Sequence, residues 1–174
     1  MKKRAALVCD ASPLIFLAKI KELELLREVL IGKGGQIVVL ECVVTELRLD
    51  AFPSTQRELL EDFLSECEII VFDDSDYPSM TLSLQDRRTL NYCIKSQPTL
   101  LLTDDLKLRS IARANDLRVT GTLGVLLEAA INEHRSPQEI QTLIGDLVRI
   151  HGLRISPQLY EAVRQKLDGM SDCS

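Results

Sequence analysis

The stretch Ala5-Ala6-Leu7-Val8-Cys9-Asp10-Ala11-Ser12-Pro13 decides the fold. It begins with an uninterrupted apolar run, which is typical of a strand buried on both faces of a parallel sheet. Asp10 follows at the carboxyl end of that strand. Ser12 is the expected N-cap of the next helix, and Pro13 suits the first helical position. This order of strand, acid and helix predicts an α/β protein with a candidate functional carboxylate at one edge of its sheet.

Outward from this start, short apolar runs alternate with helical patterns. Strands are expected at 5–9, 36–40, 68–72, 99–102 and 118–120. Helices are expected at about 14–30, from 43 through 47, at 55–66, 83–95 and 106–115, and, after a turn at 121–124, through 132. This alternation predicts a three-layer αβα sandwich around a mostly parallel sheet of about five strands.

The domain organisation follows from the same pattern. Residues 1–135 are expected to form the sandwich, and 136–174 a C-terminal helical extension packed on the same domain. Ser136-Pro137 and Ser156-Pro157 each have the N-cap and proline of a helix start, so two further helices are expected there.

Composition narrows the function classes. The chain has 174 residues with 45% apolar and 27% charged side chains, which suits one globular domain with a real core. No apolar run approaches the roughly 20 residues that span a bilayer, so we expect a soluble, cytoplasmic protein without membrane contact. The net charge of −5 argues against binding nucleic acid through a general positive field, although local contacts stay open. Five cysteines without a C-x-x-C pair, and only two histidines, leave carboxylates to carry any chemistry.

Carboxylates gather near the ends of the expected strands. Asp10 follows the first strand, and Asp104 and Asp105 follow the fourth. Glu46 lies early in the helix after the second strand, and Asp86 early in the helix before the fourth. If the first, second and fourth strands are neighbours, all five acids reach the edge where open α/β sheets bind ligands. One of Asp104 and Asp105 is expected to cap the next helix while the other faces the site.

Such a cluster indicates a metal site. Like charges a few ångströms apart repel, so a persistent cluster usually implies a bound cation, and Mg²⁺ is the first candidate for oxygen ligands. One or two such ions can activate water for attack on a phosphodiester without histidine or cysteine. Each acid also has an ordinary use as a helix cap, a solvated side chain or a partner of the helix dipole. That use is least expected for Asp10, because Ser12 is available as the cap.

Four segments occur together in an order and spacing that one family shares. They are Cys9-Asp10-Ala11-Ser12-Pro13-Leu14-Ile15, Val43-Val44-Thr45-Glu46-Leu47, Leu102-Thr103-Asp104-Asp105-Leu106, and Val119-Thr120-Gly121-Thr122-Leu123-Gly124-Val125-Leu126. This combination resembles the PIN-domain family, and especially a prokaryotic branch of it. The resemblance implies an αβα sandwich whose sheet presents three or four acids to one or two Mg²⁺ or Mn²⁺ ions, typically for cutting RNA. Many relatives are toxins of toxin-antitoxin pairs.

The resemblance also assigns residues by position. The four family acids match Asp10, Glu46, Asp86 and Asp105, which are therefore the predicted catalytic and metal-binding residues. Asp104 joins them as a predicted ligand. Ser12 and Thr103 match the supporting hydroxyls beside the first and fourth acids. The predicted function is a metal-dependent endoribonuclease that hydrolyses RNA phosphodiester bonds, as a toxin with a protein antitoxin.

Basic residues near the third and fourth acids suit the phosphates of such a substrate. We expect a phosphate-binding groove lined by Arg87, Arg88, Lys107, Arg109 and Arg113, or else a solvated helix face formed by the same residues. With aromatics at 4% and no tryptophan, base stacking has few candidates, so selectivity would come from RNA shape.

A second prediction stays open because the third motif departs from the family pattern. The branch usually has Gly-Glu there, whereas this chain has Gln85-Asp86-Arg87-Arg88, and Leu40 stands where the second motif usually has proline. The alternative is a catalytically weak or inactive PIN scaffold that binds RNA or a protein partner. Leucine-rich helix faces favour core packing first, and a homodimer or antitoxin contact second. These faces carry Leu14, Leu17, Leu23 and Leu26.

Overall fold

The computed structural model describes residues 6–32, 34–78 and 81–171. The first residue of the strand expected at 5–9, and Cys173, one of the five cysteines, lie outside these ranges. Within them, the strands form one parallel sheet in the order β3-β2-β1-β4-β5. The strands are β1 (Ala6–Cys9), β2 (Gln36–Leu40), β3 (Glu68–Ile70), β4 (Leu100–Leu102) and β5 (Val119–Thr120). The predicted adjacency is confirmed, because β1 pairs with both β2 and β4.

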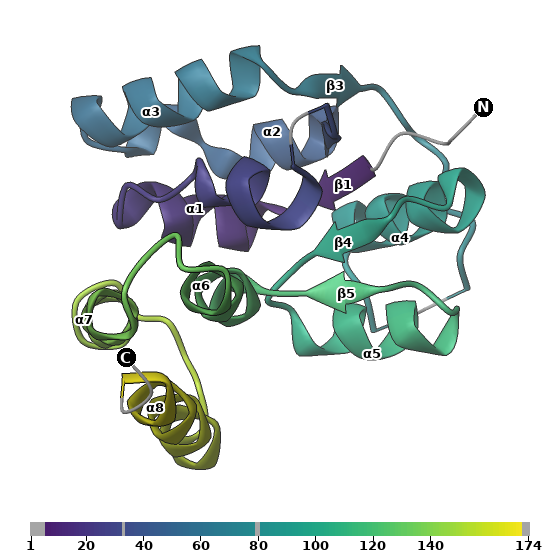
Figure 1. Ribbon diagram of the computed structural model, residues 1–174. Coiled ribbons are helices and arrows are strands. Elements are labelled where there is room, and N and C mark those ends of the chain that lie inside the picture. Colours follow the sequence, from purple (N-terminus) through teal and green to yellow (C-terminus); the bar gives the residue numbers. More distant parts are fainter. Residues whose placement is uncertain (1–5, 33, 79–80, 172–174) are drawn as a thin grey trace.

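Helices cover both faces of the sheet, so the predicted αβα sandwich is confirmed (Figure 1). They are α1 (Ala11–Lys19), the π-helical η1 (Leu26–Ile31), α2 (Glu41–Leu47), the short η2 (Leu49–Ala51), α3 (Ser54–Ser65), α4 (Leu84–Ser96), α5 (Leu106–Ala114), α6 (Thr122–Ile131), α7 (Pro137–Arg149) and α8 (Pro157–Ser171). One face is packed by α4 and α5, and the other by α1, α2, α3 and α6. None of the helices in the described ranges is long and apolar enough to cross a membrane.

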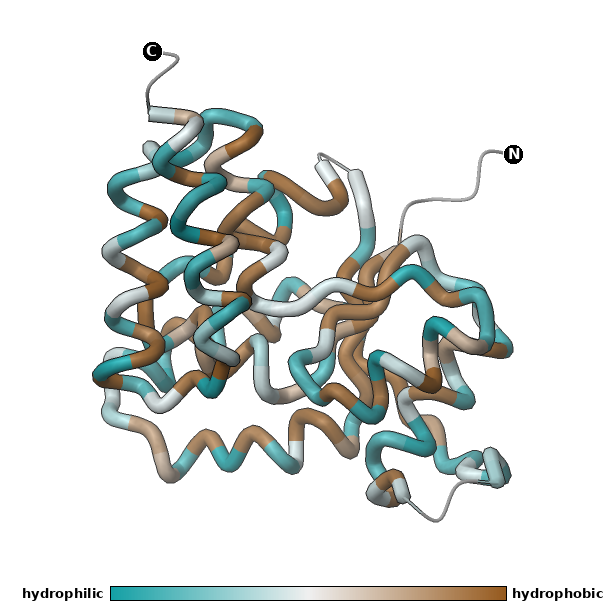
Figure 2. The backbone as a smooth tube through the Cα atoms, turned by 90° about the horizontal axis from the view of Figure 1, so that it is seen from below, coloured by the Kyte–Doolittle hydropathy of each residue, from teal (hydrophilic) through white to brown (hydrophobic). Residues whose placement is uncertain are grey.

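The strands separate two apolar cores by simple alternation. Leu7 and Cys9 of β1 face the larger core, while Val8 between them faces the smaller one under α4 and α5. This is the period of two that a strand imposes on its side chains. Figure 2 shows the consequence, because the centre of the sheet is brown whereas the helices alternate between brown and teal. Because both faces are covered, the side chains of the central strands β1, β2 and β4 are mostly buried, and their candidate functional residues lie beyond the strand ends.

Two details at the start of the chain differ from the sequence-based expectation. The N-cap of α1 is Asp10, whose side chain accepts from the Ala11 N–H, so Ser12 is not the cap and lies inside the helix. The single helix expected over 14–30 is also wrong. The chain leaves α1 after Lys19, takes a left-handed conformation at Lys21, and continues later as η1. The reversal buries Leu14, Leu17, Leu23 and Leu26 together in the larger core, the use that the sequence favours first.

The expected turn at 121–124 is wrong as well. Helix α6 begins at Thr122 with Gly121 as its N-cap, so Gly124 is helical. A Cβ atom at Gly124 would collide with the Thr120 side chain. Glycine is therefore required there for close helix-to-strand packing rather than for a turn.

The C-terminal helices begin where the sequence predicts. Ser136 caps α7 in a reciprocal capping box with Glu139, and Ser156 Oγ accepts from the Leu159 N–H at the start of α8. Ile144 of α7 and Val163 of α8 belong to the larger core. These helices are thus built onto the face that α6 covers (Figure 1).

Candidate active site

Asp10 occupies the centre of the carboxyl edge of the sheet. It follows β1, between the ends of β2 and β4, and only 7% of its surface is exposed. Its Oδ1 accepts from the Ala11 N–H at 2.9 Å, and its Oδ2 accepts from the Thr103 hydroxyl at 2.7 Å. Two donors from two segments thus fix the orientation of one buried carboxylate.

The charge on Asp10 is costly in this position. The pKa of Asp10 is raised to about 6, chiefly by burial; the hydrogen bonds from Thr103 and Ala11 lower it, and the negative charges of Asp86 and Glu46 contribute to the rise. A carboxylate held by two donors still retains its proton more readily than in water, because it is desolvated beside like charges. No cation is among the groups that shift the pKa of Asp10, so a bound cation would stabilise its charged form.

Glu46 and Asp86 approach Asp10 from opposite faces of the sheet. Glu46 is the sixth residue of the seven-residue α2, and Asp86 lies in the first turn of α4. Partial loss of hydration, and secondly the charge of Asp86, raise the pKa of Glu46. The three predicted acids Asp10, Glu46 and Asp86 are thus brought within electrostatic reach of one another.

A capping box holds Asp86. The Ser83 N–H and hydroxyl donate to its Oδ2 at 3.2 and 2.7 Å, while Ser83 Oγ accepts from the Asp86 N–H. Sequence reasoning missed Ser83, although a serine three residues before an acid is a readable capping signal. One oxygen of Asp86 is therefore committed to the helix start, and Oδ1 takes no part in the box.

The two acids after β4 both contact helix starts. Asp105 Oδ1 accepts from the Leu108 N–H at 2.7 Å and caps α5. Asp104 accepts from the Thr122 N–H through Oδ1 at 2.8 Å and from the Thr122 hydroxyl through Oδ2 at 2.5 Å. Asp104 therefore joins the end of β4 to the start of α6. Thr122 was missed because this contact links residues 18 apart, and no local pattern marks it.

Thr103 connects the two groups of acids. It is completely buried, donates to Asp10, and accepts from the Asp105 N–H at 3.2 Å. The hydroxyl that the family resemblance places beside the fourth acid thus contacts the first. Ser12 lies in the first turn of α1, two residues after Asp10.

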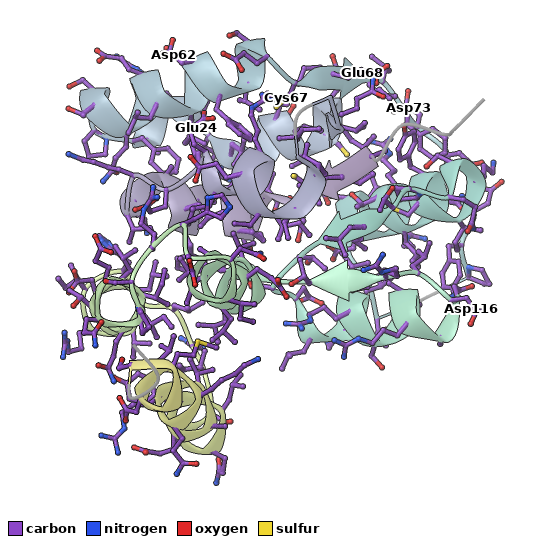
Figure 3. All side chains as sticks on the ribbon, in the orientation of Figure 1. Glu24, Asp62, Cys67, Glu68, Asp73 and Asp116 are labelled. Atoms are coloured by element: carbon purple, nitrogen blue, oxygen red, sulfur yellow. The ribbon has the colours of Figure 1, made fainter. Side chains whose placement is uncertain are left out.

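The predicted phosphate-binding residues do not share one environment. Arg88 is half-buried and forms an ion pair with Asp73 at 3.2 Å, in the segment that follows β3 (Figure 3). In the described ranges no ion pair involves Arg87, Lys107, Arg109 or Arg113. Burial, and then the charge of Arg113, lower the pKa of Arg109, while Asp104 raises it. Arg109 therefore lies near the acids after β4, whereas Arg88 is paired with Asp73, which follows β3.

The acids offer the oxygen ligands that a divalent cation prefers, but in the described residues they do not surround a metal site. Among residues 6–32, 34–78 and 81–171, no three His, Cys, Asp or Glu side chains stand close enough together to hold a metal ion. Mg²⁺ nevertheless keeps several of its waters and is commonly held by only one or two carboxylates. A buried, oriented carboxylate with two acidic neighbours fits such an ion, because the ion would stabilise its charged form.

Comparison with known proteins agrees with this architecture. The family model described as PIN domain matches residues 6–169. The crystal structure of PAE2754 from Pyrobaculum aerophilum is similar in fold, with a TM-score of 0.53 and 17% sequence identity over 73% of this chain and 91% of that chain. No curated protein matches the sequence. PIN domains have a nuclease-type fold and typically use divalent metals. Because the family model covers nearly all of the described residues, the chain belongs to the PIN-domain family.

Proposed function

We propose that this PIN domain is a metal-dependent endoribonuclease that hydrolyses RNA phosphodiester bonds at the carboxyl edge of its sheet. The observation that carries the proposal is Asp10, a buried and oriented carboxylate whose pKa is raised to about 6 by burial beside Glu46 and Asp86. Structural acids are usually paired with a cation or left in water. A buried acid beside two further acids is typical of functional sites.

Each acid has a distinct part in this proposal. Asp10 is the fixed ligand, because Thr103 and Ala11 determine where its oxygens point. Asp86 offers Oδ1, and Glu46 is exposed on a short helix and can turn toward the ion. An Mg²⁺ or Mn²⁺ ion held there would lower the pKa of a bound water and offset the charge of the phosphodiester.

Asp104 and Asp105, the two acids after β4, have different parts in this proposal. Asp105 keeps Oδ2 outside its capping bond and serves as the fourth acid. Both oxygens of Asp104 are used by Thr122, which favours a structural part for Asp104. Its predicted contact with the metal stays a prediction. Arg109, near Asp104, is suited to a phosphate of the substrate.

The second candidate is a PIN scaffold that binds RNA or a protein without cutting it. The absence of a closed cage within the described part of the chain favours it, as does the ion pair that commits Arg88 to Asp73. The toxin role, the antitoxin and the homodimer stay predictions. The leucines considered for such contacts, such as Leu14 and Leu17, are buried in the core and offer no surface for them.

Manganese titration by calorimetry separates the two candidates, with RNA cleavage measured on the same samples. We expect wild type to bind Mn²⁺ and cut single-stranded RNA, and Asp10→Asn to lose both. Asp10→Ala should likewise lose cleavage while remaining folded. Asp62→Asn is the matched control, because Asp62 is an exposed acid on α3, away from the site (Figure 3). Absence of binding to wild type at millimolar Mn²⁺ would overturn the nuclease and favour the scaffold.

A further inference from the structure

A cavity of about 470 Å³ opens beside β5, the edge strand next to β4. Its walls come from η1, from β5 with the residues before it, and from α6. Apolar side chains such as Leu30 and Leu117 form part of the lining, and Arg113, Arg118, Thr120 and Glu128 bring polar groups. The cavity thus combines an apolar wall with two guanidinium groups.

The backbone of β5 also directs polar groups away from β4, on the side of the cavity. The carbonyls of Arg118 and Thr120 accept from the Leu101 and Thr103 N–H groups of β4. In a parallel ladder the residue between them directs its N–H and C=O to the opposite side. Val119, which also lines the cavity, therefore offers one donor and one acceptor toward it.

Three arginines lie at or near β5, close to the acidic Asp116 (Figure 3). Arg109 and Arg113 lie one helical turn apart on α5, and Arg118 precedes β5. No ion pair in the described residues involves any of the three. Figure 3 shows acidic side chains along the other edge, around α3 and β3. They are Glu24, Asp62, Glu68 and Asp73. Three arginines without an ion pair in the described residues thus lie at or near β5, together with the acids Asp116 and Glu128.

Thr120, which lines the cavity, lies next to the acidic edge of the sheet, because its carbonyl accepts from the N–H of Thr103, whose hydroxyl donates to Asp10. A Cβ atom on Gly121, which directly follows β5, would lie 2.5 Å from Asp104 Oδ1 and 3.1 Å from an Arg109 nitrogen. Arg109 therefore lies between Asp104 and the next arginine of α5, Arg113. Since β5 is two strands from β1, the near end of the cavity lies roughly 10 Å from Asp10.

We propose that this cavity is a nucleotide-binding subsite, which holds the single-stranded RNA one or more nucleotides away from the bond that is cut. The proposal rests on the proposed function and specifies its substrate as a strand longer than a dinucleotide. Arg113 and Arg118 bind phosphates, because a guanidinium matches phosphate oxygens in geometry and charge. The base lies against the apolar wall, where Glu128, Thr120 and the Val119 backbone meet its polar edge.

Fluorescence anisotropy in EDTA tests the subsite without cleavage. The probes are a labelled single-stranded RNA decamer and a labelled dinucleotide, each titrated over a range of salt concentrations. For Arg113→Ala/Arg118→Ala we expect decamer affinity to fall on the order of 10-fold, and the salt slope to fall by about 1.4, the value for two lost phosphate contacts on single strands. Dinucleotide affinity should not change, because a dinucleotide at the acids does not reach the cavity.

The matched control is Arg57→Ala/Arg164→Ala, which removes a partly buried arginine on α3 and an exposed one on α8, each ion-paired with a glutamate of its own helix. Equal decamer binding by both double variants overturns the subsite and leaves the nuclease intact. An equal loss of dinucleotide affinity also overturns it, because the arginines would then act at the cutting site. Equally strong binding of poly-glutamate at these arginines would indicate a protein partner instead. The Arg113→Ala/Arg118→Ala variant should bind Mn²⁺ as wild type does. If wild type binds Mn²⁺ but no RNA, both the subsite and the ribonuclease are overturned.

Discussion

Asp10 and Asp104 each follow a central strand of the same sheet, yet their surroundings give them opposite energetic roles. Asp10 is buried beside Glu46 and Asp86, and its pKa is raised. Asp104 is only partly buried and uses both oxygens to hold the start of α6. A carboxylate at a strand end can therefore have either a functional or a structural role. Asp10 also caps α1, so what distinguishes the two acids is that Asp10 is desolvated beside like charges, whereas Thr122 donates to both oxygens of Asp104.

The largest expected effect concerns the pH dependence of the Asp10 side. The folded pKa of about 6 exceeds the ordinary value of 3.8, so the native state binds more protons between these values and stability falls as pH rises through them. The penalty is absent below pH 3.8 and fully present above pH 6. In metal-free protein, Asp10→Asn should remove it and gain up to about 3 kcal/mol at pH 7.5 but little at pH 4. Urea unfolding at both pH values measures this, and a gain that is equal at both would contradict the burial of a charge.

Substitution of Asp104 should lower the stability of the protein, whereas substitution of Asp10 should raise it. Asp104→Ala removes two hydrogen bonds to Thr122 and should cost 2 to 3 kcal/mol, about the value of bonds to a charged acceptor. Calorimetry should still find Mn²⁺ bound. A double-mutant cycle with Thr122→Val should show that most of the loss comes from this pair. Loss of Mn²⁺ binding without loss of stability would instead place Asp104 among the ligands.

Thr103 is the bridge between the two sides. Thr103→Val keeps the shape but removes the hydroxyl that donates to Asp10 and accepts from the Asp105 N–H. We expect a loss of about 2 kcal/mol at pH 7.5, because the charged acceptor loses its partner. The pKa of Asp10 should rise further, since this hydrogen bond lowers it. The loss should therefore shrink at pH 4, and a loss independent of pH would mean that Thr103 acts through packing alone.

The smallest effect on stability is expected at Glu46. Its pKa is raised by partial desolvation and by Asp86, but the side chain is exposed, so Glu46→Gln should gain well under 1 kcal/mol at pH 7.5. Mn²⁺ affinity should nevertheless fall on the order of 10-fold if Glu46 joins the ion. Thermal unfolding with and without Mn²⁺ measures both quantities. If Mn²⁺ raises the unfolding temperature of Glu46→Gln as much as that of wild type, Glu46 is not a ligand of the ion.

Local patterns predicted most of the elements and missed where long-range packing overrides them. The strand at 36–40 has the expected bounds, and α3 begins and ends one residue from expectation. The single helix over 14–30 failed because burying Leu23 and Leu26 with Leu14 requires a chain reversal at Lys21, which no glycine or proline marks. Ser12 lost the cap position because the Asp10 carboxylate already lies beside the Ala11 N–H.

The sequence by itself determined that carboxylates follow the strands of a parallel α/β sheet, since apolar runs and strand ends are local properties. Only the tertiary structure decided which acids oppose one another and which are satisfied. Asp10 and Thr103 are 93 residues apart, and Asp104 and Thr122 are 18 apart. Desolvation and charge repulsion depend on such contacts, so the chemistry of each carboxylate was decided by the fold around it.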